Sequence, residues 1–424
     1  EVAKEKGTWP LKLMLGGGLL LGPWLTLIGT MLAFWIATLF FLPLLIKNGF
    51  RGPVYSTFAT RDLCAILLPD SGYLQEEAAR YANKKGFSKH ETALPLYTSE
   101  DGKNALSCFV PVPFNEEVRL FDRTTFTFLQ AGHLLGSALI RLSDGKTTIG
   151  FTGDLGRPND PIMRPPAELG KIDYLVCEST YGNRLHEKDD PLDVLAAIIR
   201  KTVDRGGVVL IPSFAVGRAQ SILYFIHQLK QKSAIPDVPV YLNSPMAVNA
   251  TEIFVKYHEE HRLTEQQSQE TCTAATFVHT SDESQELNTL KKPMVIISAS
   301  GMATGGRILH HLLTFAPDPR NTLLFAGFQA GGTRGEAMVN GAPSIKIHGS
   351  YVPVNAEVKV LHNLSAHADY NEIIGWLKKF KTPPKRTFIT HGEPATANAL
   401  RLHIEEKLKW KVYVPDYKEG LDLV

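Results

Sequence analysis

A strand and a tight turn follow one another in Thr147-Thr148-Ile149-Gly150-Phe151-Thr152-Gly153-Asp154-Leu155-Gly156-Arg157. Residues 147–151 are β-branched, aromatic or small, which is typical of a buried strand. Asp154 then lies between two glycines, directly after that strand. Because α/β folds place their ligands at the carboxyl ends of strands, the pattern is typical of an α/β protein and makes Asp154 a candidate site residue.

Further strands and helices alternate on both sides of this stretch. Four more apolar runs predict strands, and two stretches of helical periodicity separate them. The strands are expected at 174–177, 207–211, 294–298 and 387–390, and the helices at 193–204 and 219–232. The polar stretch 264–285 is expected to form exposed helix ends and loop.

The composition is that of a folded protein. The 424 residues carry 45 Lys and Arg against 43 Asp and Glu, a net charge of +2, and 44% of the residues are hydrophobic. These values exclude a disordered polyelectrolyte, and the length suits two or three domains. The 4 cysteines include no Cys-X-X-Cys pair. They therefore exclude a disulfide scaffold, give no support for a cysteine zinc site, and favour a reducing, cytoplasmic environment.

The N-terminal region differs from the rest. Residues 13–46 form a block of 34 without a charged side chain, of which 24 are apolar. Within this block, 24–46 provides 23 uncharged residues, enough for a transmembrane helix. A buried segment of a protein core is the alternative, and basic residues on both sides favour neither orientation. Membrane association through 24–46 and burial in a core both remain open.

Histidines and acidic residues gather in short glycine-containing or strand-terminal loops. They are His133, Asp154, Glu178, His367 and His391. Any one of them alone is more often a hydrogen-bonded loop residue or a helix cap than a ligand. Together they offer imidazole and carboxylate groups, the mixture that suits a catalytic Zn²⁺ with an open position.

Five motifs carry a family resemblance. They are GHLLGSA at 132–138, TGDLGR at 152–157, ESTYG at 178–182, SAHAD at 365–369 and THGE at 390–393. In this order and spacing they resemble the β-CASP branch of the metallo-β-lactamase superfamily, whose members are RNA-processing nucleases. The resemblance implies a metallo-β-lactamase αββα sandwich with an inserted β-CASP α/β domain. The expected division is a hydrophobic segment at 1–50, the first part of the core at 51–190, the β-CASP domain at 191–343 and the last part of the core at 344–424.

The resemblance also implies roles for single residues. His133, Asp154 and His391 correspond to zinc ligands, Glu178 to the acidic residue of the first β-CASP motif, and His367 to the histidine that protonates the leaving group. The implied function is zinc-dependent hydrolysis of RNA phosphodiester bonds. A homo-oligomer is a further partner to consider. Contacts with RNA phosphates are expected from Arg218, Arg307, Arg334 and Lys346. Solvation or pairing within the domain is the alternative for these four cations.

One family signature is missing. The motif His-X-His-X-Asp-His should fall on residues 33–38, where the chain reads Ala-Phe-Trp-Ile-Ala-Thr, and the first histidine is His90. The run His258-Glu259-Glu260-His261 is no substitute and is expected to be a solvated helical face. Four of the family's seven ligands are therefore absent, which leaves one zinc or none where the family holds two. Two hypotheses follow: a ribonuclease whose activity is impaired, or a catalytically inactive, membrane-anchored RNA-binding or scaffold protein.

Overall fold

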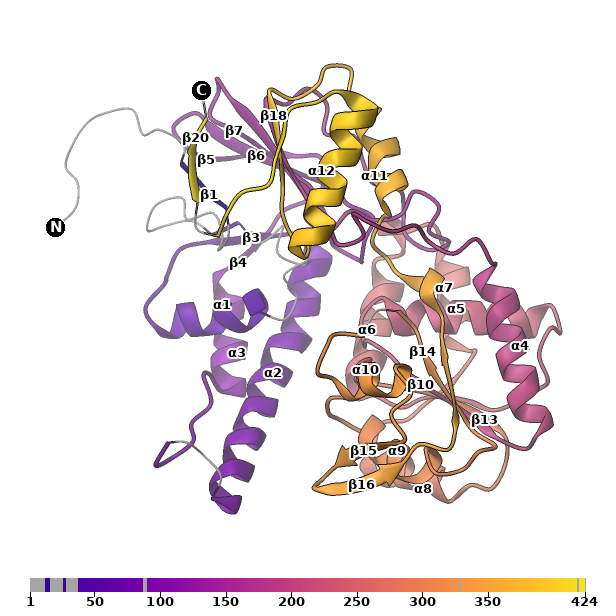
Figure 1. Ribbon diagram of the computed structural model, residues 1–424. Helices are drawn as coiled ribbons and strands as arrows, with labels where there is room; N and C mark the ends of the chain where they lie inside the picture. Colours follow the sequence, from indigo (N-terminus) through magenta and orange to yellow (C-terminus); the bar gives the residue numbers. More distant parts are fainter. Residues whose placement is uncertain are drawn as a thin grey trace. The chain divides into compact units, whose positions relative to one another are not determined.

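The computed structural model describes residues 12–15, 26–27, 37–86, 90–327, 329–417 and 419–423. The chain divides into two compact units, which are drawn as a ribbon in Figure 1. Unit 1 comprises Glu1–Pro158, Pro165–Leu185 and His367–Val424, and unit 2 comprises Asn159–Arg164 and His186–Ala366. Each unit has hydrophobic clusters of its own.

Unit 1 is built on a seven-stranded sheet in the order β19-β18-β9-β8-β7-β6-β5. Its strands are β5 (Glu117–Phe121), β6 (Thr124–Gln130), β7 (Ala138–Ser143), β8 (Thr148–Phe151), β9 (Tyr174–Cys177), β18 (Arg386–Ile389) and β19 (Val412–Tyr413). The pairs from β5 to β8 are antiparallel, whereas β8, β9, β18 and β19 run parallel. The three strands predicted in this unit are confirmed to within one residue.

A second layer of strands and two layers of helices complete unit 1. The small parallel sheet contains β2 (Thr26–Leu27), β3 (Val54–Ser56) and β4 (Phe109–Pro111), and β1 (Lys12–Leu15) pairs with β20 (Glu419–Asp422). The helices are α1 (Ala37–Lys47), α2 (Phe58–Lys85), α3 (Ser99–Ala105), the 3₁₀ turn η2 (Leu106–Cys108), α11 (Tyr370–Leu377) and α12 (Pro394–Leu408).

The packing of these elements gives four layers. Tyr55 of β3 packs against Phe126 and Phe128 of the large sheet, so the two sheets face each other. The helices α1, α2 and α3 pack on the small sheet, and α11 and α12 pack on the large one. The predicted αββα sandwich is therefore confirmed.

The end of the uncharged N-terminal block belongs to this sandwich. Leu42 and Ile46 of α1 are buried in a cluster with residues of α2, α3 and the small sheet. In the described part of the chain, no helix has both the length and the apolar character needed to cross a bilayer. Residues 24–25 and 28–36 of the predicted span lie outside the described residues. The transmembrane interpretation therefore has no support from the described residues, because α1 uses its apolar side chains for protein packing.

Unit 2 contains a six-stranded sheet in the order β12-β11-β13-β10-β14-β17, in which all neighbouring strands are parallel. The strands are β10 (Val208–Pro212), β11 (Val240–Leu242), β12 (Thr276–Phe277), β13 (Met294–Ser298), β14 (Thr322–Phe325) and β17 (Glu357–Val360). A separate hairpin is formed by β15 (Ser344–Ile347) and β16 (Ser350–Pro353).

Helices cover both faces of this sheet. One face carries α4 (Pro191–Asp204), α5 (Arg218–Gln231) and α6 (Pro245–Lys256), with α7 (Glu265–Cys272) packed on α5 and α6. The other carries α8 (Ser281–Thr289), α9 (Ile308–Phe315) and α10 (Arg334–Val339). Short 3₁₀ turns are η3 (His258–Glu260) and η4 (His362–Leu364). The predicted strands and helices of this unit are confirmed, with shifts of one or two residues.

Unit 2 is longer than the insert that the sequence predicts at 191–343. Its main segment runs from residue 186 to residue 366, and residues 159–164 also belong to it. The main reason is β17, which pairs with β14 and so completes the sheet of unit 2. Functional motifs mark loops, and they do not reveal which sheet a short strand between two of them will join.

The charged run 258–261 is not the solvated face that its composition predicts. His261 is 1% exposed, and its ring stacks on Phe254 with a centroid distance of 4.1 Å. Burial lowers the pKa of His261 to about 4. The prediction is wrong for this residue because the chain leaves the helix at η3 and turns the last imidazole inward.

A second buried histidine lies in the core of unit 2. His311 Nδ1 lies 2.7 Å from Asn288 Oδ1 and donates to it, while Nε2 lies 2.5 Å from Asn243 Nδ2 and accepts from it. Both ring nitrogens are thus used by a neutral imidazole. Burial lowers the pKa of His311 to about 4.

Unit 2 is therefore expected to lose stability in mild acid. The unfolded chain takes up the proton near pH 6.5, whereas the folded chain resists it down to about pH 4, so stability is lost as the pH falls between these values. For one such histidine the loss between pH 7 and pH 5 is about 2 kcal/mol. Urea unfolding at the two pH values would measure it. His311→Gln should reduce the pH dependence by that amount, whereas His348→Gln, on the exposed hairpin turn, should not; equal pH dependence in both variants would contradict the assignment.

Candidate active site

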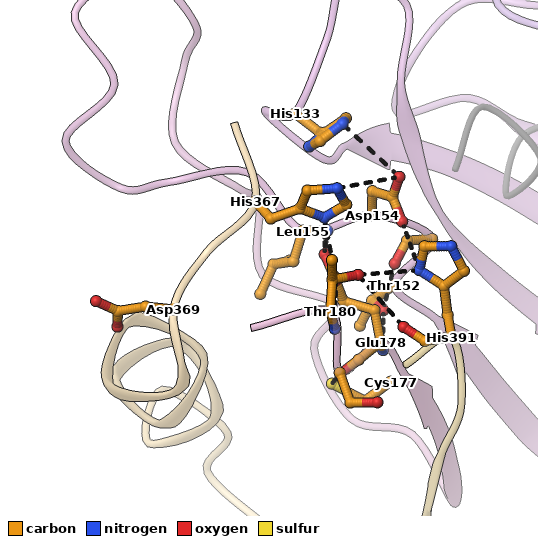
Figure 2. Close-up of polar contacts among 12 residues, drawn as sticks. His133, Thr152, Asp154, Leu155, Cys177, Glu178, Thr180, His367, Asp369 and His391 are labelled. Atoms are coloured by element: carbon orange, nitrogen blue, oxygen red, sulfur yellow. Dashed lines mark hydrogen bonds and ion pairs between the residues drawn. The ribbon is translucent and has the colours of Figure 1, made fainter. Parts of the chain in front are cut away.

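Strands of unit 1 that end at one edge of the sheet place the candidate site. β8 leads to Asp154, β9 leads directly to Glu178, and β18 leads to His391. Since these three strands are parallel neighbours, their carboxyl ends meet at the same edge. His133 lies in the loop between β6 and β7, and His367 lies shortly before α11. Figure 2 shows these five predicted residues together.

Asp154 lies at the centre, surrounded by three imidazoles (Figure 2). Its Oδ1 is 3.1 Å from His391 Nδ1. Its Oδ2 is 3.7 Å from His133 Nε2 and 4.0 Å from His367 Nε2. Asp154 and His133 are each 6% exposed. A buried carboxylate with three imidazoles on its two oxygens is an arrangement suited to holding a cation.

Asp154 and the neighbouring histidines shift each other's pKa through their charges. Burial alone would raise the pKa of Asp154, but the imidazoles, His367 foremost, outweigh burial and lower it to about 2. Burial would likewise lower the pKa of His391, but its contact with Asp154 prevails and raises that pKa. Asp154 therefore carries a full negative charge throughout the physiological pH range.

Glu178 holds His367 in place. His367 Nδ1 lies 3.1 Å from Glu178 Oε2 and 3.2 Å from Oε1. The backbone N–H groups of Leu155 and Thr180 donate to the same carboxylate, which is 2% exposed. With Nδ1 directed at Glu178, the other ring nitrogen, Nε2, faces the side of Asp154. A carboxylate thus fixes both the orientation and the tautomer of this imidazole.

Close backbone approach brings the loops together. A Cβ atom on Gly156 would lie 2.0 Å from the carbonyl of Gly132, so only glycine fits between the Asp154 turn and the His133 loop. The His367 segment joins the same turn, because Ala368 N donates to Leu155 O at 2.8 Å. His391 has a φ of 53°, a left-handed conformation that costs free energy for a residue with a side chain.

Two threonine hydroxyls at the site are not among the residues predicted from the sequence. Thr180 Oγ1 lies 3.2 Å from His391 Nδ1, and Thr152 Oγ1 accepts a hydrogen bond of 3.0 Å from Glu178 N. Both lie inside motifs already quoted, ESTYG and TGDLGR. Their presence in these motifs was the one indication of a role that the sequence offered. The contacts themselves form only because β8, β9 and β18 are neighbours in the folded sheet.

The donor atoms fit a metal ion. At this site, two groups of described residues have all their ligand atoms within 4.8 Å of one another: His133, Asp154 and His367, and Asp154, Glu178 and His391. Asp154 belongs to both groups. Imidazole nitrogen and carboxylate oxygen are ligands that Zn²⁺ accepts. Of residues 33–38, where the missing motif should fall, 33–36 lie outside the described residues.

The four predicted RNA contacts all lie in unit 2, where Arg307 and Arg334 donate hydrogen bonds to backbone carbonyls. Arg307 donates to Asn243 Oδ1 and to the carbonyls of residues 278 and 279. Arg334 donates to the carbonyls of residues 303, 304 and 346. Lys346 is exposed, and its ammonium lies 6.0 Å from the ring centroid of Tyr351. Arg218 begins α5 beside Gly327.

Two family models and several curated proteins match the sequence of this chain. Residues 219–338 match the family model of the Beta-Casp domain, and residues 351–415 match that of the Zn-dependent metallo-hydrolase RNA specificity domain. The chain is 35% identical over 367 residues to a ribonuclease of Thermus thermophilus, an alignment that covers 85% of this chain and 79% of that protein. The chain belongs to the β-CASP metallo-β-lactamase family of RNA-processing nucleases.

Other members of this family show similar identity. The RNase J-like protein of Methanocaldococcus jannaschii is 33% identical over 325 residues, covering 75% of this chain and 76% of that protein. The transcription termination factor FttA of Methanosarcina mazei is 31% identical over 385 residues, which cover 87% of this chain but only 58% of that protein. The family predicted from the five motifs is confirmed.

Proposed function

We propose that this chain is a zinc-dependent ribonuclease that hydrolyses RNA phosphodiester bonds. The observation that carries the proposal is the cluster of three histidines and two carboxylates at one edge of the unit 1 sheet. Family membership supports RNA as the substrate, since one relative is named a ribonuclease and a matched family model is described as an RNA specificity domain.

For the metal, the proposal is one zinc, held by His133, Asp154 and His391. The reason for one rather than two is the absence of His-X-His-X-Asp-His from residues 33–38. Three protein ligands and an open position suffice for a catalytic zinc. Zinc bound there would provide a hydroxide at neutral pH and would offset the charge of the phosphate.

For proton transfer, the proposal assigns His367 as general acid. When the P–O bond of the RNA backbone breaks, the departing ribose oxygen needs a proton, and the hydroxyl of water ends on phosphorus. His367 would donate that proton from Nε2, while Glu178 at Nδ1 stabilises the protonated ring. Hydrogen bonds from two backbone N–H groups hold Glu178 in position for this role.

For binding RNA, Lys346, whose side chain is exposed, is the favoured phosphate contact in unit 2. Arg307 and Arg334 hold loops of unit 2 through their hydrogen bonds to backbone carbonyls, and Arg307 also to Asn243. Their replacement would disturb those loops first and RNA binding as a consequence.

Metal analysis is the direct test of this function. The purified protein is expected to contain about one zinc per chain, the number that three ligands support. It should cleave a labelled single-stranded RNA, and a chelator should abolish cleavage until zinc is restored. Two zincs per chain would contradict the single-metal site.

The missing signature favours one rival function, a catalytically inactive RNA-binding or scaffold protein. That rival predicts RNA binding without zinc and without cleavage. A metal-free preparation that binds RNA, remains inactive after zinc is added, and behaves like its His367→Ala variant would establish the rival and overturn the ribonuclease.

A further inference from the structure

Unit 1 carries a concentration of positive charge that the active site does not use. Residues 378–386, from the end of α11 to the first residue of β18, contain five cations and no acidic residue. Two more cations lie at 409 and 411, after α12. The whole chain has a net charge of only +2, so this is a local feature. We call it the basic patch, and its members are Lys378, Lys379, Lys381, Lys385, Arg386, Lys409 and Lys411, all exposed.

Aromatic packing brings the two segments together. The ring of Phe380 lies edge-on to that of Trp410, with a centroid distance of 5.8 Å. Trp376 also lies edge-on to Phe380, with a centroid distance of 5.2 Å. Thr387 N, one residue after Arg386, donates to the carbonyl of Lys411 at 2.9 Å. The lysines that flank Phe380 therefore lie beside those that flank Trp410.

Little negative charge opposes the basic patch. Lys385 Nζ lies 3.7 Å from Asp173 Oδ1. The other six cations form no ion pair with the described residues. Glu405, on the last turns of α12, is already held by Arg401 at 2.6 Å. Six exposed cations without acidic partners leave a strong positive potential on this surface.

The basic patch lies at the end of the sheet opposite to the active site. Arg386 is the first residue of β18, whereas His391 follows its last residue. The four residues of β18 separate the two ends by about 13 Å of strand. A ligand of the basic patch would therefore occupy a surface distinct from the catalytic edge.

We propose that the basic patch is a second binding surface for single-stranded RNA, which holds the strand by its phosphates away from the point of cleavage. The choice of RNA rests on the proposed function. It is favoured over an acidic protein because Phe380 and Trp410 are only partly buried among the lysines. Cations combined with aromatic faces bind phosphates and bases together, whereas an acidic peptide uses the cations alone.

Binding of a fluorescent 30-nucleotide oligouridine, measured by anisotropy with a chelator present to prevent cleavage, tests this surface. The variant combines Lys378→Ala, Lys379→Ala, Lys381→Ala, Lys409→Ala and Lys411→Ala. Its affinity in 50 mM KCl is expected to fall at least about 10-fold, and the slope of log affinity against log salt should decrease by up to about 3, because each phosphate contact to a single strand contributes about 0.7.

A matched variant removes five exposed lysines elsewhere, at Lys84, Lys85, Lys232, Lys291 and Lys292. It changes the net charge equally and should retain wild-type affinity and slope. Equal losses in both variants would overturn the proposal, as would full competition by polyglutamate at equal charge. This binding measurement does not depend on catalysis. If the chain is inactive but its RNA binding depends on the basic patch, the proposed ribonuclease activity is refuted and the proposed binding surface is retained.

Discussion

Asp154→Asn is expected to remove zinc and RNA cleavage together. Asp154 is common to both groups of candidate ligand atoms at the site, and its two oxygens face three imidazoles. The amide keeps the shape of the side chain but loses the charge that attracts the cation. Loss of a residue that only supports a ligand costs about 10- to 100-fold in metal affinity, so loss of this ligand should cost at least that much.

The expected measurements are a zinc content near zero after dialysis and a cleavage rate at background. Asp204→Asn, an exposed position on α4, is the matched control and should keep both zinc and activity. Thermal unfolding should show that Asp154→Asn is folded, since the substitution removes a charge but keeps the size of the side chain. A variant that keeps its zinc would show that the metal is held elsewhere.

His367→Ala is expected to separate chemistry from metal binding. If His367 donates the proton to the leaving oxygen, its loss should lower kcat by about 10²- to 10⁴-fold. Zinc content should stay at the wild-type value, because the proposed ligands are His133, Asp154 and His391. The alkaline limb of the pH–rate profile should change as well, since the group that must be protonated has been removed.

The structure makes this a demanding test, because His367 Nε2 is also within reach of Asp154. Loss of zinc in His367→Ala would show that His367 is a ligand and not the general acid. His403→Ala is the control: its ring stacks on Tyr370 on the surface of α11 and α12, at a centroid distance of 4.2 Å. Unchanged kcat in the His367 variant would contradict the assigned role.

The residues of the site were predictable where strand ends determine position. Asp154, Glu178 and His391 each follow a strand within a few residues, and parallel neighbouring strands bring such positions to one edge. The partners of the basic residues were not predictable. The residues around Arg307 in the sequence do not show whether its guanidinium binds a phosphate or the amide of Asn243. Only the fold places Asn243 Oδ1 within 2.9 Å of it.

Side-chain chemistry and order along the chain are properties of the sequence alone: which motifs are present, that His-X-His-X-Asp-His is missing, and to which family the chain belongs. Distances between residues far apart in sequence belong to the tertiary structure. It joined β17 to the sheet of unit 2, turned His261 inward, and buried Leu42 and Ile46 in protein. It also brought Phe380 against Trp410 and so created the basic patch. The physical reason is that burial and pairing depend on all the surfaces that meet at a residue, whereas a local pattern records only its neighbours along the chain.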